Sequence, residues 1–308
     1  MKAALVLLVS LCILTVGDVS ADIFGTGGNQ FEIEFVTISS DTNPVSGYGI
    51  VNYDYRIGKY EITNDQWDKF VNAYGQVYGS PYSAYEDDSR TKGPNMPTTN
   101  ISWYEAAQYV NWMNTSNGYQ AAYKFTGTQG ESSYRLGIWT TEEAFNGTNL
   151  FRHKDAYYFL PSEDEWEKAA FWNGNEMQTF ATKDDSFPIA EVTTNFDPGI
   201  GGMGPWEVGN GFEELNGTFN MMGNVSEMIE SPYIMGDYFP SSKRTFRGGT
   251  YGSDLRFIAS GYRGFTYPES YTYSSGFRVA SIPEPTTFAF LALGGLILSK
   301  RRNYFRSH

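Results

Sequence analysis

Cysteine is almost absent from this chain. The 308 residues contain one cysteine, Cys12, which lies inside the apolar stretch at the N-terminus. Downstream of it the chain can form no internal disulfide, no thiolate nucleophile and no cysteine-ligated metal site. A domain built from residues 22–282 must therefore be held together by its own packed core, and its length is sufficient for one large domain.

Histidine and positive charge are also scarce. The two histidines are His153 and His308, so the sequence offers no histidine cluster for non-haem iron. We interpret His153 as a surface or packed residue, because a lone histidine is more often structural than catalytic. The net charge is −13, and no basic stripe precedes the C-terminal tail, so nucleic acid is a poor partner. Cations and neutral glycans fit this charge better.

The N-terminus, residues 1–21, has the pattern of a secretory signal peptide. Lys2 precedes an apolar run over residues 3–16, and Val19-Ser20-Ala21 offers a small-residue cleavage site. The alternative is a buried N-terminal helix. The signal peptide predicts export of residues 22–282 across the cytoplasmic membrane, to the cell envelope, the outer surface or the medium.

The C-terminal segment 283–308 combines Pro283-Glu284-Pro285, an apolar stretch over 286–299 and a basic tail over 300–308. A helix of that apolar length spans only about 21 Å of a hydrocarbon core that is about 30 Å thick. This order of features resembles the PEP-CTERM sorting signal of Gram-negative bacteria. The resemblance implies recognition by an exosortase-type membrane protease, commonly alongside exopolysaccharide production, and membrane anchoring before processing. The alternative is a plain C-terminal anchor.

Three helices are predicted from capping boxes, in which a hydroxyl residue is followed three positions later by Glu or Gln. The pairs are Thr63 with Gln66, Ser102 with Glu105, and Ser162 with Glu165. Between and after these helices the chain is rich in glycine, asparagine and tyrosine, which predicts a domain dominated by structured loops. We expect residues 22–30 to be a loose lead-in and residues 119–157 to be an insertion between two helices.

Six segments, in order, resemble the formylglycine-generating enzyme family, also called sulfatase-modifying factors. They read "YRIGKYEITNDQWDKF", "MPTTNISWYEAAQYVNWMN", "YFLPSEDEWEKAAFW", "NMMGNVSEMIES", "RTFRGGTYGSD" and "GFRVAS", and they cover about residues 31–281. The resemblance implies an α+β, C-type-lectin-like fold. Such a fold has a small twisted sheet, helices packed against it and many ordered loops.

The same resemblance implies an oxidase chemistry that this chain lacks the residues to perform. Family members with that activity bind copper through two cysteines after a Gly-Gly-Ser-aromatic motif, which here reads Gly248-Gly249-Thr250-Tyr251. The cysteine positions fall on Ser253 and Ile258, which cannot supply thiolates, so we expect no copper and no catalytic residue there. Ser253 and Asp254 have no nearby histidine base. We expect the acidic run 163–165 to complement a helix dipole.

A structural calcium is the cofactor that the resemblance implies. The segment "NMMGNVSE" would supply side-chain oxygens from Asn220 and Glu227 and carbonyl oxygens from Gly223 and Val225. Hard oxygen donors of this kind suit Ca²⁺. A second family site would begin at Asn195 and Phe196, with Asp197 as a provisional further ligand. The alternative is a capped turn without metal.

The segment after Gly261 is unusually rich in aromatic residues for a polar stretch bounded by glycine and proline. We predict that Phe265, Tyr267, Tyr271 and Tyr273 are partly exposed and form a ligand surface, with Tyr251 and Arg263 beneath it. These are the candidate binding residues, for an exopolysaccharide, a cell-surface glycan or a protein. The sequence thus predicts an exported, surface-sorted binding or structural module. An oxidase of the family, or a different oxidation enzyme on the same fold, is the alternative.

Overall fold

The computed structural model describes residues 19–75, 77, 91–197, 199 and 204–283. These residues form three helices, α1 (Asn64–Tyr74), α2 (Trp103–Ser116) and α3 (Glu163–Phe171), with short 3₁₀ turns η1 (Gly27–Asn29) and η2 (Leu255–Phe257). The strands are β1 (Val19–Phe24), β2 (Phe31–Ile38), β3 (Tyr55–Gly58), β4 (Phe125–Thr126), β5 (Arg135–Leu136), β6 (Ala144–Phe145), β7 (Asn149–His153), β8 (Tyr158–Phe159), β9 (Ser226–Pro232), β10 (Arg244–Arg247), β11 (Gly264–Thr266), β12 (Ser275–Gly276) and β13 (Ala280–Ser281).

The larger sheet has the order β1-β2-β3-β13-β8, and every neighbouring pair is antiparallel. The expectation of a loose lead-in over residues 22–30 was wrong. Residues Val19–Phe24 pair along their whole length with β2, and Asp22 forms an ion pair of 2.6 Å with the buried Arg56 of β3. Alternating apolar side chains on β2 face the core, which fixes the register of this edge.

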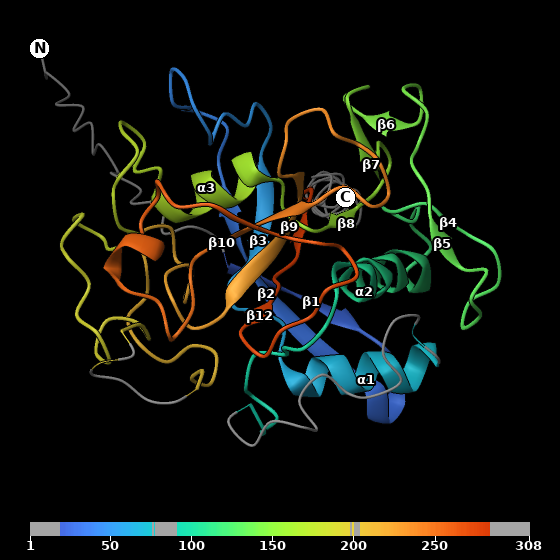
Figure 1. The fold of residues 1–308 in the computed structure, drawn as a ribbon, viewed down its shortest axis with the longest axis horizontal. Coiled ribbons are helices and arrows are strands. Elements are labelled where there is room, and N and C mark those ends of the chain that lie inside the picture. The colour runs from blue at the N-terminus through green and yellow to red at the C-terminus, as the bar shows by residue number, and fades with distance from the viewer. Residues whose placement is uncertain (1–18, 76, 78–90, 198, 200–203, 284–308) are drawn as a thin grey trace, which may run out of the picture.

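The smaller sheet has the order β11-β10-β9-β12, so β11 forms one of its edges. The segment 119–157, expected as an insertion, contributes the two-stranded sheets β4–β5 and β6–β7, and β7 is followed directly by β8. These pieces lie at the side of the molecule beyond α2, while long loops form the opposite side (Figure 1).

All three predicted capping boxes are present at the helix N-termini. Thr63, Ser102 and Ser162 each accept a hydrogen bond from the backbone of the Gln or Glu three residues on, whose side chain accepts from the backbone of the capping residue. Helix α1 ends at Gly75 with a φ of 88°, a conformation that favours glycine.

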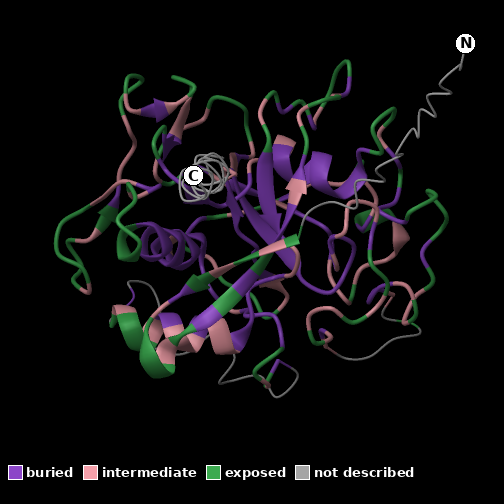
Figure 2. Ribbon diagram, turned by 180° about the vertical axis from the view of Figure 1, so that it is seen from behind, coloured by how far each residue is buried: buried purple, intermediate pink, exposed green. Residues whose placement is uncertain are grey.

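Aromatic side chains form much of the core between the helices and the sheets. Trp67 and Phe70 of α1 contact Tyr109 of α2, whose ring also meets Phe277 edge-on at 5.4 Å. Buried residues gather along both sheets and α2, and exposed residues lie in the peripheral loops (Figure 2). Within the described residues no helix is both long and apolar enough to cross a bilayer; the apolar stretches 3–16 and 286–299 lie outside them.

The architecture is therefore α+β, as the sequence predicted. Few helices and several short sheets position a large number of ordered loops.

Candidate functional site

Strand β10 leads into a tight turn that glycine alone can form. Gly248 and Gly249 have φ values of 90° and 72°, and a Cβ on Gly249 would lie 2.7 Å from the carbonyl oxygen of Phe257. The turn therefore presses the chain after β10 against residues 257 and 258. This is the frame in which the family resemblance places the two copper-binding cysteines.

The two residues at those positions have structural roles. The Ser253 hydroxyl accepts a hydrogen bond of 2.9 Å from the backbone of Thr250 and so caps the turn. Ile258 is fully buried in the hydrophobic core. Neither side chain fits a soft cation such as Cu(I), and no group of three or more His, Cys, Asp or Glu side chains among the described residues could hold a metal.

The acidic run at the start of α3 does more than complement a helix dipole. Both oxygens of Glu163 accept from Arg263 at 2.7 Å, and Arg247 lies 2.8 Å from the same carboxylate. Asp164 accepts from the backbone of Gly49, and Glu165 pairs with the buried Arg152 at 2.7 Å. Each carboxylate thus ties α3 to a different loop or strand.

Arg263, predicted beneath the ligand surface, is partly buried and held by Glu163. Its guanidinium lies 4.6 Å from the centre of the Tyr233 ring, and Tyr233 contacts Phe265 at 4.9 Å. The structure thus links Arg263 to the aromatic segment through one intervening ring. Burial, together with the nearby Glu163 carboxylate, raises the pKa of Tyr48, whose ring lies 5.3 Å from Arg263.

The segment from Phe265 to Tyr273, here called the aromatic loop, has exposed rings on a fixed backbone. The exposed fractions are 42% for Phe265, 49% for Tyr267, 58% for Tyr271 and 40% for Tyr273. The backbone carbonyls of Pro268 and Thr272 accept hydrogen bonds from the backbones of Tyr104 and Asn100, and the carbonyl of Ser274, just after the loop, accepts from Ser226. Tyr251 is half-buried, its backbone donates to Asn224, and no ring contact joins it to the aromatic loop among the described residues.

Glu227, the carboxylate of the predicted calcium site, is already paired. It is fully buried, and Arg278 donates to both of its oxygens at 2.5 and 2.7 Å while the Trp166 indole donates at 2.8 Å.

The other predicted ligands of this site also have structural roles. The Asn220 side chain donates to Glu61. Val225 is buried, and Gly223 has a φ of 78° with a Cβ position only 2.1 Å from the Asn195 carbonyl. These residues do not fit a calcium ion centred on Glu227, because the carboxylate would first have to leave Arg278.

In the second predicted set, which begins at Asn195 and Phe196, one side-chain atom is suited to bind a cation. The side-chain oxygen of Asn195 is fully buried and has no hydrogen-bond partner among the residues that the structure describes, whereas its amide nitrogen donates to Gly204 and Asn224. Phe196 is buried, and the Asp197 carboxylate accepts from Gly199. Part of this loop, residues 198 and 200–203, lies outside the described residues. Calcium therefore stays a prediction, with Asn195 as the residue that would hold it.

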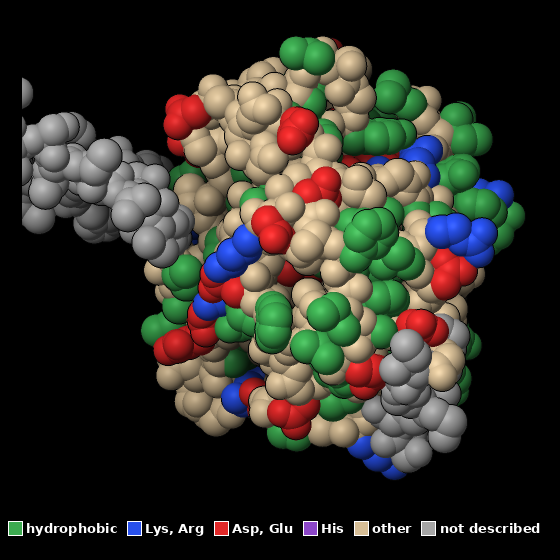
Figure 3. Space-filling model, turned by 90° about the vertical axis from the view of Figure 1, so that its left-hand side faces the viewer, with side chains coloured by type: hydrophobic (Ala, Val, Ile, Leu, Met, Phe, Trp, Pro, Cys, Tyr) green, Lys and Arg blue, Asp and Glu red, His purple; other side chains and the backbone are tan. Residues whose placement is uncertain are grey.

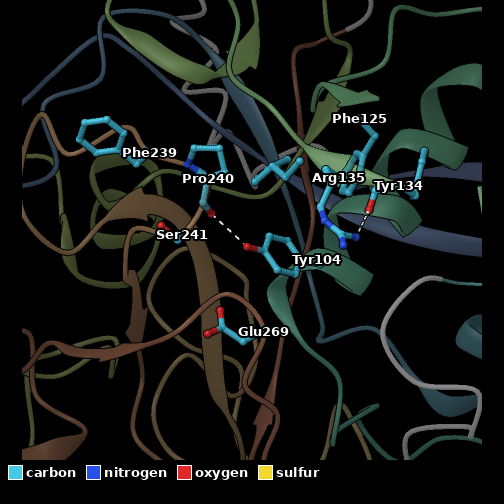
Figure 4. Close-up of a pocket in the computed structure, with 9 residues that line it drawn as sticks. Tyr104, Phe125, Tyr134, Arg135, Phe239, Pro240, Ser241 and Glu269 are labelled. Atoms are coloured by element: carbon cyan, nitrogen blue, oxygen red, sulfur yellow. Dashed lines mark hydrogen bonds between the residues drawn. The ribbon is translucent and has the colours of Figure 1, made fainter. Parts of the chain in front are cut away.

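A groove that the sequence analysis missed lies next to the aromatic loop. Its volume is about 590 Å³ (Figure 4). The lining comes from five separate segments: Tyr104; Phe125; Tyr134, Arg135 and Leu136; Phe239, Pro240 and Ser241; and Glu269 of the aromatic loop. No single motif marks it, because these residues meet only in the folded chain. His153, by contrast, packs edge-on against Trp139 and takes no part in the groove.

Two variants can distinguish a stabilising effect of bound calcium from that of the Glu227–Arg278 ion pair. If Asn195 holds Ca²⁺, a chelator should lower the Tm of the wild type, and Asn195→Ala should remove that difference. Glu227→Gln should lower the Tm equally with and without chelator, since its effect is to leave the buried Arg278 without its carboxylate partner. Thermal melts with EDTA or added Ca²⁺ decide between them, and a wild-type Tm that chelator leaves unchanged would count against calcium.

Two buried carboxyl groups predict that stability falls as the pH rises. Burial raises the pKa of Glu61 and of Glu214 to about 7, whereas an unfolded glutamate titrates near about 4.3. Between these values the folded state holds protons that the unfolded state has lost, so the free energy of unfolding decreases by up to roughly 1.4 kcal/mol per pH unit for each group. We expect a lower Tm at pH 7.5 than at pH 5, and a shallower slope in Glu61→Gln than in the exposed control Glu32→Gln. A Tm that rises over this range would refute the assignment.

Comparison with known proteins agrees with this architecture. The chain superimposes on the solved structure titled CarF with a TM-score of 0.61 and 21% identity, over 82% of this chain and 99% of that one. It superimposes on Treponema denticola variable protein 1 with a TM-score of 0.58 and 18% identity, over 85% and 99% of the two chains. Both likenesses concern the fold.

Sequence comparison adds a distant relative and a family. A stretch of 138 residues is 28% identical to the chaperone protein LppX of Paenibacillus barcinonensis, and it spans 44% of this chain and 42% of that protein. The sequence model of the sulfatase-modifying factor enzyme 1-like domain family matches residues 19–282, which include both sheets, the three helices and the glycine turn after β10. The chain therefore belongs to the sulfatase-modifying factor enzyme 1-like domain family.

Proposed function

We propose that this protein is an exported, surface-sorted binding module that uses its aromatic loop, and not an oxidase. The observation that carries the proposal is the contrast within that loop. Its backbone is held by hydrogen bonds from Asn100 and Tyr104 and by the pairing of β11 with β10, while four aromatic side chains are 40–58% exposed. A rigid backbone lowers the entropic cost of binding, and exposed tyrosines offer flat apolar faces with a hydroxyl at the rim.

The position of the aromatic loop also favours a binding role. Phe265 lies on β11, at the edge of the four-stranded sheet, where Lys243 approaches its ring to 3.8 Å and Tyr267 meets it edge-on. The rings of Phe265 and Tyr267 are therefore oriented by their neighbours. Extracellular glycans and surface proteins are the ligands that such a surface suits.

The export and sorting parts of the proposal rest on the sequence at the two ends. The signal-peptide pattern over residues 1–21 supports translocation, and the Pro-Glu-Pro, apolar and basic order of residues 283–308 supports processing by an exosortase-type protease. A binding module retained at the cell surface would present the aromatic loop to the medium.

The oxidase alternative is disfavoured by the roles of two residues. Ser253 caps a turn and Ile258 fills the core, so neither position offers a copper ligand. A purified domain that converts cysteine to formylglycine in a sulfatase-type peptide, above an empty control and with added copper, would contradict our proposal.

A second exposed apolar surface provides the control for a binding test. The loops between α3 and β9 form the left-hand side of Figure 1, and hydrophobic side chains lie there among acidic ones (Figure 3). Phe187 is 72% exposed within these loops. Phe187→Ala also removes an exposed aromatic ring but leaves the aromatic loop unchanged, so it serves as the control.

The test is to replace Tyr267 and Tyr271 together by alanine and to measure binding on a glycan microarray and to a displayed peptide library. The double variant should lose at least about tenfold in affinity for the ligands that the wild type binds, because exposed central aromatics carry much of a binding energy. Its Tm should stay within about 3 °C of the wild type, and Phe187→Ala should bind normally. Binding that survives the double change would show that the aromatic loop is not the ligand surface.

A further inference from the structure

The groove beside the aromatic loop has one wall made of stacked rings. Phe125 of β4 and Tyr134, which precedes β5, lie parallel with centroids 4.8 Å apart and an angle of 18° between the rings. Pairing of β4 with β5 holds the two residues in this arrangement, since Phe125 lies opposite Leu136 in the ladder. A smaller depression of about 250 Å³ also borders on Phe125 and Tyr134.

The opposite wall, residues 239–241, is fixed from beneath by a buried cation. The guanidinium of Arg244 donates to the carbonyls of Pro240 and Ser242, which flank Ser241. The same guanidinium lies 4.4 Å from the Trp103 ring centre and 3.7 Å from that of Phe151. Burial lowers the pKa of Arg244 to about 9, so the group keeps its charge at neutral pH and holds both carbonyls.

Tyr104 donates a third hydrogen bond to the same wall. Its hydroxyl donates to the Pro240 carbonyl at 3.2 Å, and its backbone donates to Pro268 of the aromatic loop (Figure 4). The wall at 239–241, the start of α2 and the aromatic loop are therefore held together. The groove is preformed, and its volume lies in the range of about 300–1,000 Å³ that small-molecule sites occupy.

The polar groups of the groove carry both signs of charge. Arg135 lies on the ring wall and Glu269 on the side of the aromatic loop, with the Ser241 hydroxyl on the wall opposite the rings. Saccharide hydroxyls both donate and accept hydrogen bonds, so a sugar can donate to the Glu269 carboxylate and accept from the Arg135 guanidinium at the same time. Its C–H faces would pack on the rings.

Charge decides which class of saccharide fits. An anionic sugar would meet Glu269 and a chain whose net charge is −13. A cationic sugar would meet Arg135 in the lining and Arg244 beneath it. We propose that the groove is a binding subsite for a neutral oligosaccharide, which stacks on Phe125 and Tyr134 and reaches along the aromatic loop through Glu269. This inference rests on the proposed binding function and names its ligand class.

Ser241 allows the subsite to be tested without disturbing the core, because it is exposed. Ser241→Trp fills the groove and should weaken binding of neutral polysaccharides (dextran, mannan and β-glucan) by at least about tenfold in titration calorimetry. Ser241→Asp adds a charge with little volume and should change the same affinities by less than about threefold, since a neutral ligand gains or loses little Coulomb energy. Ser46→Trp, at another exposed serine, should bind like the wild type.

Three outcomes would overturn the inference. The first is that the wild type binds only polygalacturonate, which is anionic, chitosan, which is cationic, or a peptide. The second is unchanged binding in Ser241→Trp, and the third is a large effect of Ser241→Asp. If Ser241→Trp binds normally while the Tyr267 and Tyr271 double variant does not, the groove is not the subsite and the aromatic loop remains the binding surface. If neither variant affects binding, both proposals fail.

Discussion

Arg152, Arg247 and Arg278 are fully buried, and each is paired with carboxylates that come from a different part of the chain. Arg278, just before β13, binds Glu227 of β9 and donates to the carbonyls of Gly58 and Phe219. The residues that the structure describes include no cysteine. Such a guanidinium makes several directed contacts at once and so fixes loops that a disulfide would otherwise join. The attraction between the charges is largely offset by desolvation, so the main contribution of these pairs is to specify position.

The candidate binding surfaces depend on the same kind of contact. Glu163 joins Arg247 of β10 to Arg263, and Arg263 supports Tyr233 and through it Phe265 of the aromatic loop. Arg244 has no ion pair among the described residues, yet its two aromatic neighbours and two carbonyl acceptors hold one wall of the groove. Loops that are fixed in this way can present apolar rings to solvent without collapsing, which is what a preformed site requires.

Local signals in the sequence predicted the local structure well. The capping boxes at Thr63, Ser102 and Ser162 marked the three helices because hydroxyl and carboxyl partners lie within one turn. The exposure of Tyr267 and Tyr271 followed from a polar stretch that offers no periodic pattern. The lead-in was misjudged because pairing of β1 depends on a partner strand and on Arg56, which no local pattern reveals. The role of Glu227 was missed for the same reason, since Arg278 lies 51 residues further on.

The most direct test of this account is the free energy of unfolding of Glu163→Gln, measured by urea denaturation beside the control Glu34→Gln. Glu163 binds two arginines and is buried, whereas Glu34 is 44% exposed and lies 3.5 Å from Lys59. The account predicts a loss of about 1.5–3 kcal/mol for Glu163→Gln, because the charged hydrogen bonds to Arg263 are lost and Arg247 keeps only Glu167 as a carboxylate partner. It predicts less than about 1 kcal/mol for Glu34→Gln. Equal and small losses in the two variants would contradict the claim that buried arginine–carboxylate contacts hold the loops of this domain.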